Sequence, residues 1–534
     1  MKKDTFDVIL FSDVSNSIGF GRYAGPYRIA TELRNHGFSV LVVDFFSDFS
    51  SLQIRDILQL YMANHTLFIG FSTTLMSLNN PTSDNFAYKN DYASISEWQK
   101  GIFAQNAATM QEIFSYIKQK NALTQIVVGG SKASAGGVRG VDWWVWGEAD
   151  ASIVALAKHF SENSAVKYSS FSNGSKRIIS EDYPYVDFCH SQIGYQDHDF
   201  IFLKEVLPIE ISRGCIFNCS FCTFKHRGKK ASESLKNPES LFQEMSHNHR
   251  HFKTTEYLFS DDTFNDSIEK IREIIALKNR LGFDLQFSTF CRLDMITRHP
   301  EMADLLLEAG LKCVNFGIES FNETALKQAH KYAFPAEKIK ETLFFIKEKW
   351  KDNIVVTANF IVGLPGESEE SVRSTADWLS ANNSPIDSFN FLPLFVVPKY
   401  GDVEDKTAIL TNKMGVNPEK YKILLDYKTG DWEHDLMNKR RAIELVNEFE
   451  SSSVIRRKTT VNRSGFYGRL KNIGFSHEDC VSDLIKDLPA EEFRRRRKIL
   501  FKRYFTALMS GKTEMSEISD LFLNELLEPN RPAG

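Results

Sequence analysis

The sequence predicts an α/β protein with an open parallel sheet at its N-terminus, a partial parallel barrel in the middle and a helical region at its C-terminus. Up to about residue 400, short apolar segments alternate with segments that carry apolar residues at helical spacing. This alternation is typical of parallel sheets that are covered by helices. After residue 400 the chain is highly charged, and its apolar residues recur mostly at helical spacing.

Four segments follow from this pattern. The length of 534 residues and the hydrophobic content of 42% suffice for two or three domains. We expect a sheet domain over residues 1–165, a connector over 166–206, a barrel over 207–400 and a helical domain over 401–534.

Each expected element rests on a local apolar pattern. Strands of the sheet domain are expected at residues 7–11, 39–45, 67–71, 125–128 and 143–146, with helices at 26–36, 104–119 and from 150. Barrel strands are expected at residues 207–211, 256–259, 285–290, 313–318, 354–362 and 388–394, with helices at 239–247, 268–281, 301–308, 336–350 and 369–381. C-terminal helices are expected at residues 433–450 and 490–508, and residues 77–98 are interpreted as an inserted polar loop.

Composition limits the partners and the cellular location that we expect for this protein. A net charge of -4 gives no electrostatic reason to expect nucleic acid or an anionic membrane as a partner. The N-terminal segment does not resemble a signal peptide, and no run approaches the roughly 18 apolar residues of a membrane span. Seven cysteines, three of them in one loop, do not form the framework of a secreted disulfide protein, so we expect a cytoplasmic location.

The most informative segment is the loop that carries Cys215, Cys219 and Cys222 after the first barrel strand. Three thiolates so close in sequence suit one metal centre. Held by three cysteines, a 4Fe-4S cluster keeps one iron open for a small ligand. The alternative is a structural zinc site that His226 would complete as a Cys3His set.

The spacing C-x3-C-x2-C resembles the cluster motif of the radical S-adenosylmethionine (SAM) superfamily. The resemblance implies that Cys215, Cys219 and Cys222 hold a 4Fe-4S cluster whose open iron binds SAM. It also implies reductive cleavage of SAM to a 5'-deoxyadenosyl radical, with an electron donor such as flavodoxin or ferredoxin. Phe221, beside the third cysteine, would pack near the adenine.

The same resemblance assigns SAM contacts to the carboxyl ends of later barrel strands. Asp261 and Asp262 would hold the SAM amino group, although a carboxylate before a helix, including Asp266, can instead cap that helix. Arg292 would pair with the SAM carboxylate, and a surface salt bridge to Asp294 is the alternative. Two further contacts follow from the motifs G-I-E-S and G-L-P-G-E: Glu319 near the ribose or methionine, and the turn with Gly363 and Pro365 against the adenine.

The first domain resembles the Rossmann-like cobalamin-binding domain of one radical SAM subgroup. The resemblance rests on Phe68–Thr74, Ile126–Gly130 and Asp142–Glu148. It would place Ser72, Thr74, Gly129 and Gly130 at the corrin tail, with the glycines allowing close approach of the backbone. The cobalt-ligating histidine of that fold is absent, because the loop after the first strand reads Asp13-Val-Ser-Asn-Ser-Ile-Gly19. A Rossmann-like domain kept for packing or substrate docking is the alternative.

Two features of the C-terminal region have structural interpretations beside functional ones. Arg494–Arg497 forms a basic run that we interpret as a solvated helix face rather than as a contact for RNA or a peptide leader. Trp432 and His434 are interpreted as a buried packing pair rather than as groups that face the active site.

The sequence thus predicts a radical SAM enzyme that methylates an unactivated carbon with the help of cobalamin. Its substrate would be a small molecule or a peptide. One alternative keeps the radical chemistry without methyl transfer, as a rearrangement, epimerisation or cyclisation. Another is a metal-stabilised binding protein without catalysis.

Overall fold

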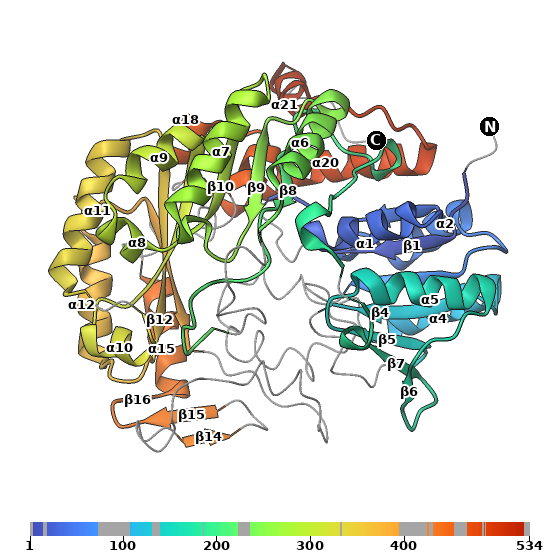
Figure 1. Cartoon of the computed structure of the whole chain (residues 1–534), viewed down its shortest axis with the longest axis horizontal. Helices are drawn as coiled ribbons and strands as arrows, with labels where there is room; N and C mark the ends of the chain where they lie inside the picture. Colours follow the sequence, from blue (N-terminus) through green and yellow to red (C-terminus); the bar gives the residue numbers. More distant parts are fainter. Residues whose placement is uncertain are drawn as a thin grey trace.

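The computed structural model describes residues 4–13, 19–72, 107–130, 139–184, 186–222, 235–331, 334–394, 424–426, 431–452, 467–482, 485 and 488–527. Within these residues the chain forms an N-terminal sheet domain, a six-stranded barrel sheet and a C-terminal region that contacts both (Figure 1). The predicted α/β class is confirmed.

The N-terminal sheet has the strand order β2-β1-β3-β4-β5-β7-β6, and all neighbouring pairs except β6–β7 are parallel. Its strands are β1 (Val8–Phe11), β2 (Val40–Val43), β3 (Phe68–Ser72), β4 (Gln125–Gly129), β5 (Trp143–Trp146), β6 (Ser169–Ser170) and β7 (Lys176–Ile179). Its helices are α1 (Ala24–Asn35), α2 (Ser51–Tyr61), α4 (Ala107–Lys120) and α5 (Asp150–Glu162). The first five strands are almost fully buried, as expected for a parallel sheet covered on both faces.

The predicted end of this domain at residue 165 was wrong. Strand β7 pairs with β5 in parallel, so residues 169–179 belong to the sheet and not to the connector. The sequence pattern hides β7 because two of its four residues are basic. The ammonium of Lys176 lies 4.6 Å from the centre of the Trp143 ring and the guanidinium of Arg177 lies 4.2 Å from that of Trp146, so both cations are held by cation–π contacts.

The barrel sheet has the order β13-β12-β11-β10-β9-β8, with every described pair parallel. Its strands are β8 (Leu207–Glu210), β9 (Glu256–Ser260), β10 (Gln286–Cys291), β11 (Leu311–Glu319), β12 (Val355–Val362) and β13 (Ser388–Pro393). Its helices are α6 (Pro238–Phe252), α7 (Ile268–Arg280), α8 (Leu293–Arg298), α9 (Met302–Ala309), α10 (Glu323–Gln328), α11 (Ala336–Trp350) and α12 (Glu369–Ser380). Figure 1 shows α11 and α12 on the side of this sheet that faces away from the N-terminal domain.

The C-terminal region is less purely helical than predicted. It contains a small antiparallel sheet of β14 (Leu424–Asp426), β15 (Asp431–His434) and β16 (Met437–Asn438). Its helices are α15 (Lys439–Ser451), α17 (Tyr467–Asn472), α18 (His477–Val481), α20 (Ala490–Ser510) and α21 (Ile518–Leu527). The helix expected from residue 433 therefore begins at Lys439, where the side chain of Asn438 caps it by accepting a hydrogen bond from the backbone N–H of Arg441.

The C-terminal helices share a core with the N-terminal sheet. Buried side chains of β1, such as Ile9 and Phe11, belong to the same apolar cluster as Tyr467, Tyr504 and Phe522. Figure 1 shows α20, in red, beside the N-terminal domain, and α20 packs against α2. The two ends of the chain are thus folded together.

Arg497, at the end of the basic run Arg494–Arg497, stabilises the contact between α20 and the N-terminal domain. The interpretation as a solvated face fits Arg494 and Arg495 but was wrong for Arg497, which is buried. The guanidinium of Arg497 makes a two-pronged ion pair with Asp48 and donates to the carbonyl of Gly19 at 3.0 Å. Spacing alone cannot separate these arginines, because they differ only in which face of α20 they occupy.

Arg497→Ala is expected to destabilise the protein by about 2 kcal/mol, because it leaves Asp48 without its partner beside a buried surface. Arg495→Ala removes an exposed pair with Glu492 and should cost less than about 0.5 kcal/mol. Urea unfolding followed by tryptophan fluorescence measures both. Equal midpoints for the two variants would contradict a specific role for Arg497.

Candidate functional site

The structure brings the predicted cluster and SAM residues to one edge of the barrel sheet. The cysteine loop follows β8, Asp261 follows β9 and Arg292 follows β10. Glu319 ends β11 and Gly363 follows β12. Because the strands are parallel and adjacent, their carboxyl ends form a single edge, which is where barrels of this type place their active sites.

The cysteine loop is attached to the neighbouring strand ends through its thiols. Cys215 Sγ lies 3.3 Å from Thr263 Oγ1, and Arg292 Nη1 donates to Cys219 Sγ at 3.2 Å. The backbone N–H of Ser220 donates to the carbonyl of Ala329, just after α10, at 3.0 Å. Gly214 has φ +121°, a conformation that favours glycine, so the chain can turn sharply into the loop. The loop is therefore held from three sides.

The donor set suits an iron–sulfur cluster in its chemistry. Burial raises the pKa of the Cys215 thiol, whereas Thr263 lowers it. Among the described residues, no group of three or more His, Cys, Asp or Glu side chains is close enough to share one metal ion. In a 4Fe-4S cluster each protein thiolate bonds to a different iron, so a cluster does not require such a group. His226, the fourth ligand of the zinc alternative, lies outside the described residues.

Arg292 is buried and already engaged. Its guanidinium forms an ion pair with Asp294 at 2.6 Å and lies 3.8 Å from the centre of the Phe217 ring. The predicted alternative of a salt bridge to Asp294 is thus present, but it is not on the surface. Arg292 also contacts Cys219, so its guanidinium, oriented by Asp294, lies directly at the cysteine loop.

The two predicted aspartates differ in their surroundings. Asp261 is buried, accepts from Lys270 Nζ at 2.9 Å and also accepts from the backbone N–H of Thr263 at 2.8 Å. Lys270 also pairs with Asp266 at 2.9 Å, so Asp266 is an ion-pair partner and not a helix cap. The cap of α7 is Ser267. Asp262, in contrast to Asp261, is partly exposed.

Glu319 has an unusual backbone conformation at the end of β11. Its φ is +71°, which is uncommon for a residue with a side chain, and its carboxylate accepts from Lys331 Nζ at 3.1 Å. Lys331 also donates to the carbonyl of Gly317 and lies 5.9 Å from the centre of the Phe221 ring. Lys331 was not predicted, because no sequence motif surrounds it. It joins the cysteine loop to the end of β11.

The turn after β12 is covered by the small C-terminal sheet. Trp432 and His434 on β15 are both buried and stack nearly in parallel, so the predicted packing pair is present. Trp432 Nε1 donates to the carbonyl of Leu394, and His434 Nε2 lies 3.2 Å from the carbonyl of Gly363. The backbone N–H of Leu436 donates to His434 Nδ1, so Nε2 carries the proton. The pair therefore fixes the predicted adenine turn.

Glu367 lies at the end of the same turn, and its side chain is buried. Its Oε1 accepts from Ser320 Oγ at 2.5 Å, which links the turn after β12 to the end of β11. Burial raises the pKa of Glu367 to about 8, although the hydrogen bonds from Ser320 and the Gly363 backbone lower it. The carboxyl is therefore mainly protonated at neutral pH. In the sequence, Glu367 is distinguished only as the last residue of the motif G-L-P-G-E.

Glu367→Gln is expected to remove a pH dependence. The folded-state pKa lies above the ordinary value of 4.5, so Glu367 stabilises the fold most below pH 4.5 and loses that effect as the pH rises toward 8. Stability should fall by roughly 1.4 kcal/mol per pH unit over this window from Glu367 alone. Thermal unfolding at pH 6 and pH 9 should show a smaller decline for Glu367→Gln than for the wild type. Parallel declines would contradict the raised pKa.

The predicted cobalamin residues lie at the carboxyl edge of the N-terminal sheet. Ser72 on β3 and Gly129 on β4 are register partners, and Gly130 follows with φ +100°. A side chain at Gly129 would meet only ordinary contacts, so the conformational need for glycine is at Gly130. Thr74 lies outside the described residues, as do residues 14–18 and the polar segment 77–98.

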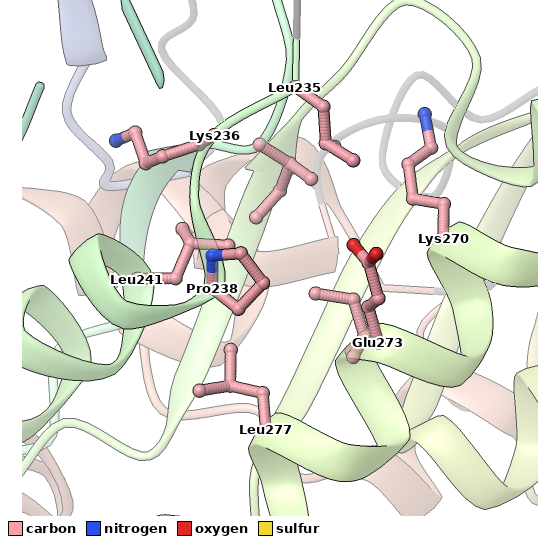
Figure 2. Close-up of a pocket in the computed structure, with 9 residues that line it drawn as sticks. Leu235, Lys236, Pro238, Leu241, Lys270, Glu273 and Leu277 are labelled. Atoms are coloured by element: carbon pink, nitrogen blue, oxygen red, sulfur yellow. The ribbon is translucent and has the colours of Figure 1, made fainter. Parts of the chain in front are cut away.

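A small cavity lies between α6 and α7 (Figure 2). Its volume of about 10 Å³ is room for a single water molecule. Leu241 and Leu277 line it, and Figure 2 shows the amine of Lys236 pointing away from it. This cavity does not correspond to the predicted site.

Comparison with known families identifies the central domain. Residues 209–379 match the radical SAM superfamily. This segment includes the cysteine loop and the ends of β8 to β12. The chain therefore contains a radical SAM domain, and enzymes of this superfamily use a 4Fe-4S cluster and SAM.

Curated relatives cover this part of the chain. An uncharacterized methyltransferase of Pyrococcus horikoshii is 30% identical over 166 residues, 31% of this chain and 34% of the relative. The hopanoid C-2 methylase of Rhodopseudomonas palustris is 26% identical over 188 residues, 34% of this chain and 35% of the relative. The chain thus spans about a third of the length of these relatives.

Two solved structures share the fold over a larger part of the chain. OxsB, a cobalamin-dependent SAM radical enzyme, is 13% identical with a TM-score of 0.55, covering 98% of this chain and 75% of its own. TsrM, a radical SAM methyltransferase of Kitasatospora setae, is 18% identical with a TM-score of 0.51, covering 73% of this chain and 74% of its own. The chain therefore shares its fold with these two enzymes, whose own structures contain cobalamin. Across the described residues, no helix is both long and apolar enough to cross a membrane.

Proposed function

We propose that this protein is a radical SAM enzyme that generates a 5'-deoxyadenosyl radical and methylates an unactivated carbon with the help of cobalamin. One observation carries the proposal. The three cysteines of the radical SAM motif lie in one loop, and that loop is bonded to the ends of β9 and β10 through Thr263 and Arg292. The edge where this occurs is where a barrel enzyme binds its substrates.

Cys215, Cys219 and Cys222 would hold the cluster. When bound, the cluster supplies the electron that cleaves SAM, and cobalamin supplies the methyl group. Arg292 beside Cys219 would offset the negative charge of the thiolates, and its guanidinium has the geometry to face the SAM carboxylate as well. Asp294 keeps this arginine in place.

The other SAM contacts divide between charged groups and backbone. Asp261 and Asp262 would hold the SAM amino group, and Lys270 holds the carboxylate of Asp261 in place. Glu319, held by Lys331, would face the ribose or methionine part. Gly363 and Pro365 would offer the adenine a rigid turn, and Phe221 would pack near it.

The assignment of cobalamin to the N-terminal domain rests on the fold and on the sheet edge. Ser72, Gly129 and Gly130 lie together at that edge, and Gly130 has a backbone conformation suited to close approach. The sequence has no histidine at the motif position of the cobalt ligand, so binding would not use one from that loop. The relatives that are named as methyltransferases favour methyl transfer.

We further propose a small molecule or peptide as the substrate and a flavodoxin-like or ferredoxin-like protein as the reductant. Radical chemistry without methyl transfer is the second candidate. It is favoured by the fold match to OxsB, because OxsB is described as a radical enzyme. The match to OxsB also extends over more of the chain than the match to TsrM does.

The test uses SAM that carries a deuterated methyl group. Anaerobically reconstituted, reduced protein with added cobalamin should release 5'-deoxyadenosine, and a methylated product should carry the label. Release of 5'-deoxyadenosine with no label in any product and no S-adenosylhomocysteine would favour the second candidate. If neither compound forms from SAM, both candidates are wrong.

A further inference from the structure

Arg213 lies two residues before the first cysteine of the loop and is held by carboxylates. Its guanidinium donates to both oxygens of Asp150, at 3.0 and 3.1 Å, and to both oxygens of Glu210, at 2.9 and 3.2 Å. The carboxylate of Glu148 lies 3.7 Å from its Nη1. These hydrogen bonds occupy most of the five N–H donors that an arginine has. Arg213 is therefore engaged by the protein itself.

The two main partners of Arg213 belong to different domains. Asp150 is the first residue of α5 in the N-terminal domain, whereas Glu210 ends β8 of the barrel sheet. Their side chains are 7% and 13% exposed. Two-pronged pairs of an arginine with a carboxylate are strong and fix the geometry of both groups. The start of the cysteine loop is therefore fixed to both domains.

Arg28 of α1 extends the contact on the N-terminal side. Its Nε donates to Asp150 Oδ1 at 2.9 Å and lies 4.0 Å from Glu210 Oε2. Its Nη1 donates to the carbonyl of Gln192 in the connector at 3.0 Å. Helix α1 also packs against β8. Arg28, Asp150, Arg213 and Glu210 thus form one interdomain ion-pair network in which positive and negative groups alternate.

The connector supplies an aromatic ring to the same arginine. Phe188 is buried, and the centre of its ring lies 4.9 Å from the guanidinium carbon of Arg213. The planar guanidinium can stack on a ring and pair with two carboxylates at once, whereas a lysine ammonium is a point charge. The position therefore requires an arginine and not merely a positive charge.

The network lies at the carboxyl edge of the N-terminal sheet, where the cobalamin residues were predicted. Val145 of β5 is the register partner of Gly129 on β4. The chain leaves β5 through Gly147, whose φ is +88°, and reaches Asp150 three residues later. Through Asp150, this edge is bonded to Arg213 and so to the start of the cysteine loop.

We propose that Arg213 is a positioning residue that, through Asp150 and Glu210, fixes the cysteine loop to the N-terminal domain. It thereby sets where the cluster lies relative to a cofactor at the edge of that domain. This inference rests on the proposed function, but the part that concerns the loop requires only the cluster. Asp150 is 63 residues from Arg213 and belongs to the other domain, so its loss should still change the properties of the cluster.

The first test compares Asp150→Asn with Glu32→Gln in protein reconstituted anaerobically with iron and sulfide. Glu32 is the matched control, because it is a similarly buried carboxylate that pairs with Arg28 on the same helix. Asp150→Asn keeps the shape of the side chain but removes its charge, so the loop is held less firmly. Release of iron to a chelator should become about fivefold to tenfold faster, and Glu32→Gln should release iron at the wild-type rate.

The reduction of the cluster gives a second readout, which a loss of stability alone does not predict. In Asp150→Asn the positive charge of Arg213 is less compensated, and a positive charge beside a cluster favours the added electron. At a fixed solution potential, the ratio of reduced to oxidised cluster should rise about threefold or more. Asp150→Glu restores the carboxylate and should return this ratio and the rate of iron release toward the wild-type values.

Arg213→Lys keeps the charge but not the two-pronged pairs, so it should also release iron about fivefold to tenfold faster. This variant decides the test if thermal unfolding shows that Asp150→Asn does not fold. Wild-type rates of iron release in the folded variant, or an equal acceleration in Glu32→Gln, would overturn the inference.

A further measurement addresses the relative placement of the two cofactors. EPR spectroscopy of protein that contains the reduced cluster and cob(II)alamin detects the magnetic coupling between them, which depends steeply on their separation. The coupling should be uniform in the wild type and in Glu32→Gln, and weaker or more broadly distributed in Arg213→Lys. The same coupling in all three proteins would overturn the role in placement. If cobalamin does not bind, the proposed function is wrong, whereas iron release still decides whether Arg213 holds the loop.

Discussion

Cys219→Ala is expected to abolish SAM cleavage, with a loss of at least about 1,000-fold in the rate of 5'-deoxyadenosine formation. Cys219 is the most buried of the three loop thiols, and it accepts a hydrogen bond from Arg292. Without its sulfur, the loop would offer a cluster only two ligands. The iron content after anaerobic reconstitution, measured together with sulfide, should fall from about four irons per chain toward zero.

The matched control is Cys189→Ala, a free cysteine in the connector that is only partly buried. It should retain full iron content and SAM cleavage. If Cys219→Ala kept its iron, or if Cys189→Ala lost as much as Cys219→Ala, the assignment of the cluster to this loop would be wrong.

Gly363→Ala is expected to cause the second large effect, a loss of at least about 2 kcal/mol in stability together with weaker SAM binding. The position has φ +98°, and a Cβ there would lie 2.2 Å from the ring of Trp432. Either the turn after β12 or the small C-terminal sheet must move. Equilibrium dialysis with labelled SAM and thermal unfolding measure the two effects.

A second variant separates the two causes. In the double variant Gly363→Ala with Trp432→Ala, the clash is removed and only the backbone strain remains, so part of the stability should return. Gly25→Ala, where a Cβ would meet no atom within 4 Å, serves as the control and should be tolerated. If Gly363→Ala behaved like Gly25→Ala, Trp432 would not hold the turn.

The fold was predictable wherever strands are buried on both faces. Continuous apolar runs such as Val8–Phe11 and Trp143–Trp146 define their strands within a residue or two. Prediction failed where a strand carries polar residues. Basic residues hid β7, which lies between β5 and the edge strand β6, and the helix predicted from residue 433 overlaps the strand Asp431–His434.

The place of the candidate site in the fold was predictable where a loop motif follows a strand. The cysteine loop, Arg292 and the turn at Gly363 all lie at the expected edge. What the sequence could not show is how these groups are paired across the fold. Lys270 is nine residues from Asp261, and Lys331 lies twelve residues beyond Glu319, with no motif around either lysine. Only the three-dimensional structure shows that Asp261 is buried and bonded to Lys270, whereas Asp262 is partly exposed.

The core that joins Ile9 and Phe11 to Tyr504 and Phe522 sets an order for folding during synthesis. The first strands leave the ribosome long before the helices that cover them. The side chains of α2 and α4 in this cluster are translated early, but the part of the core that Tyr504 and Phe522 supply is completed only after residue 522. The apolar surface that these two residues cover is therefore a natural target for chaperones during biogenesis.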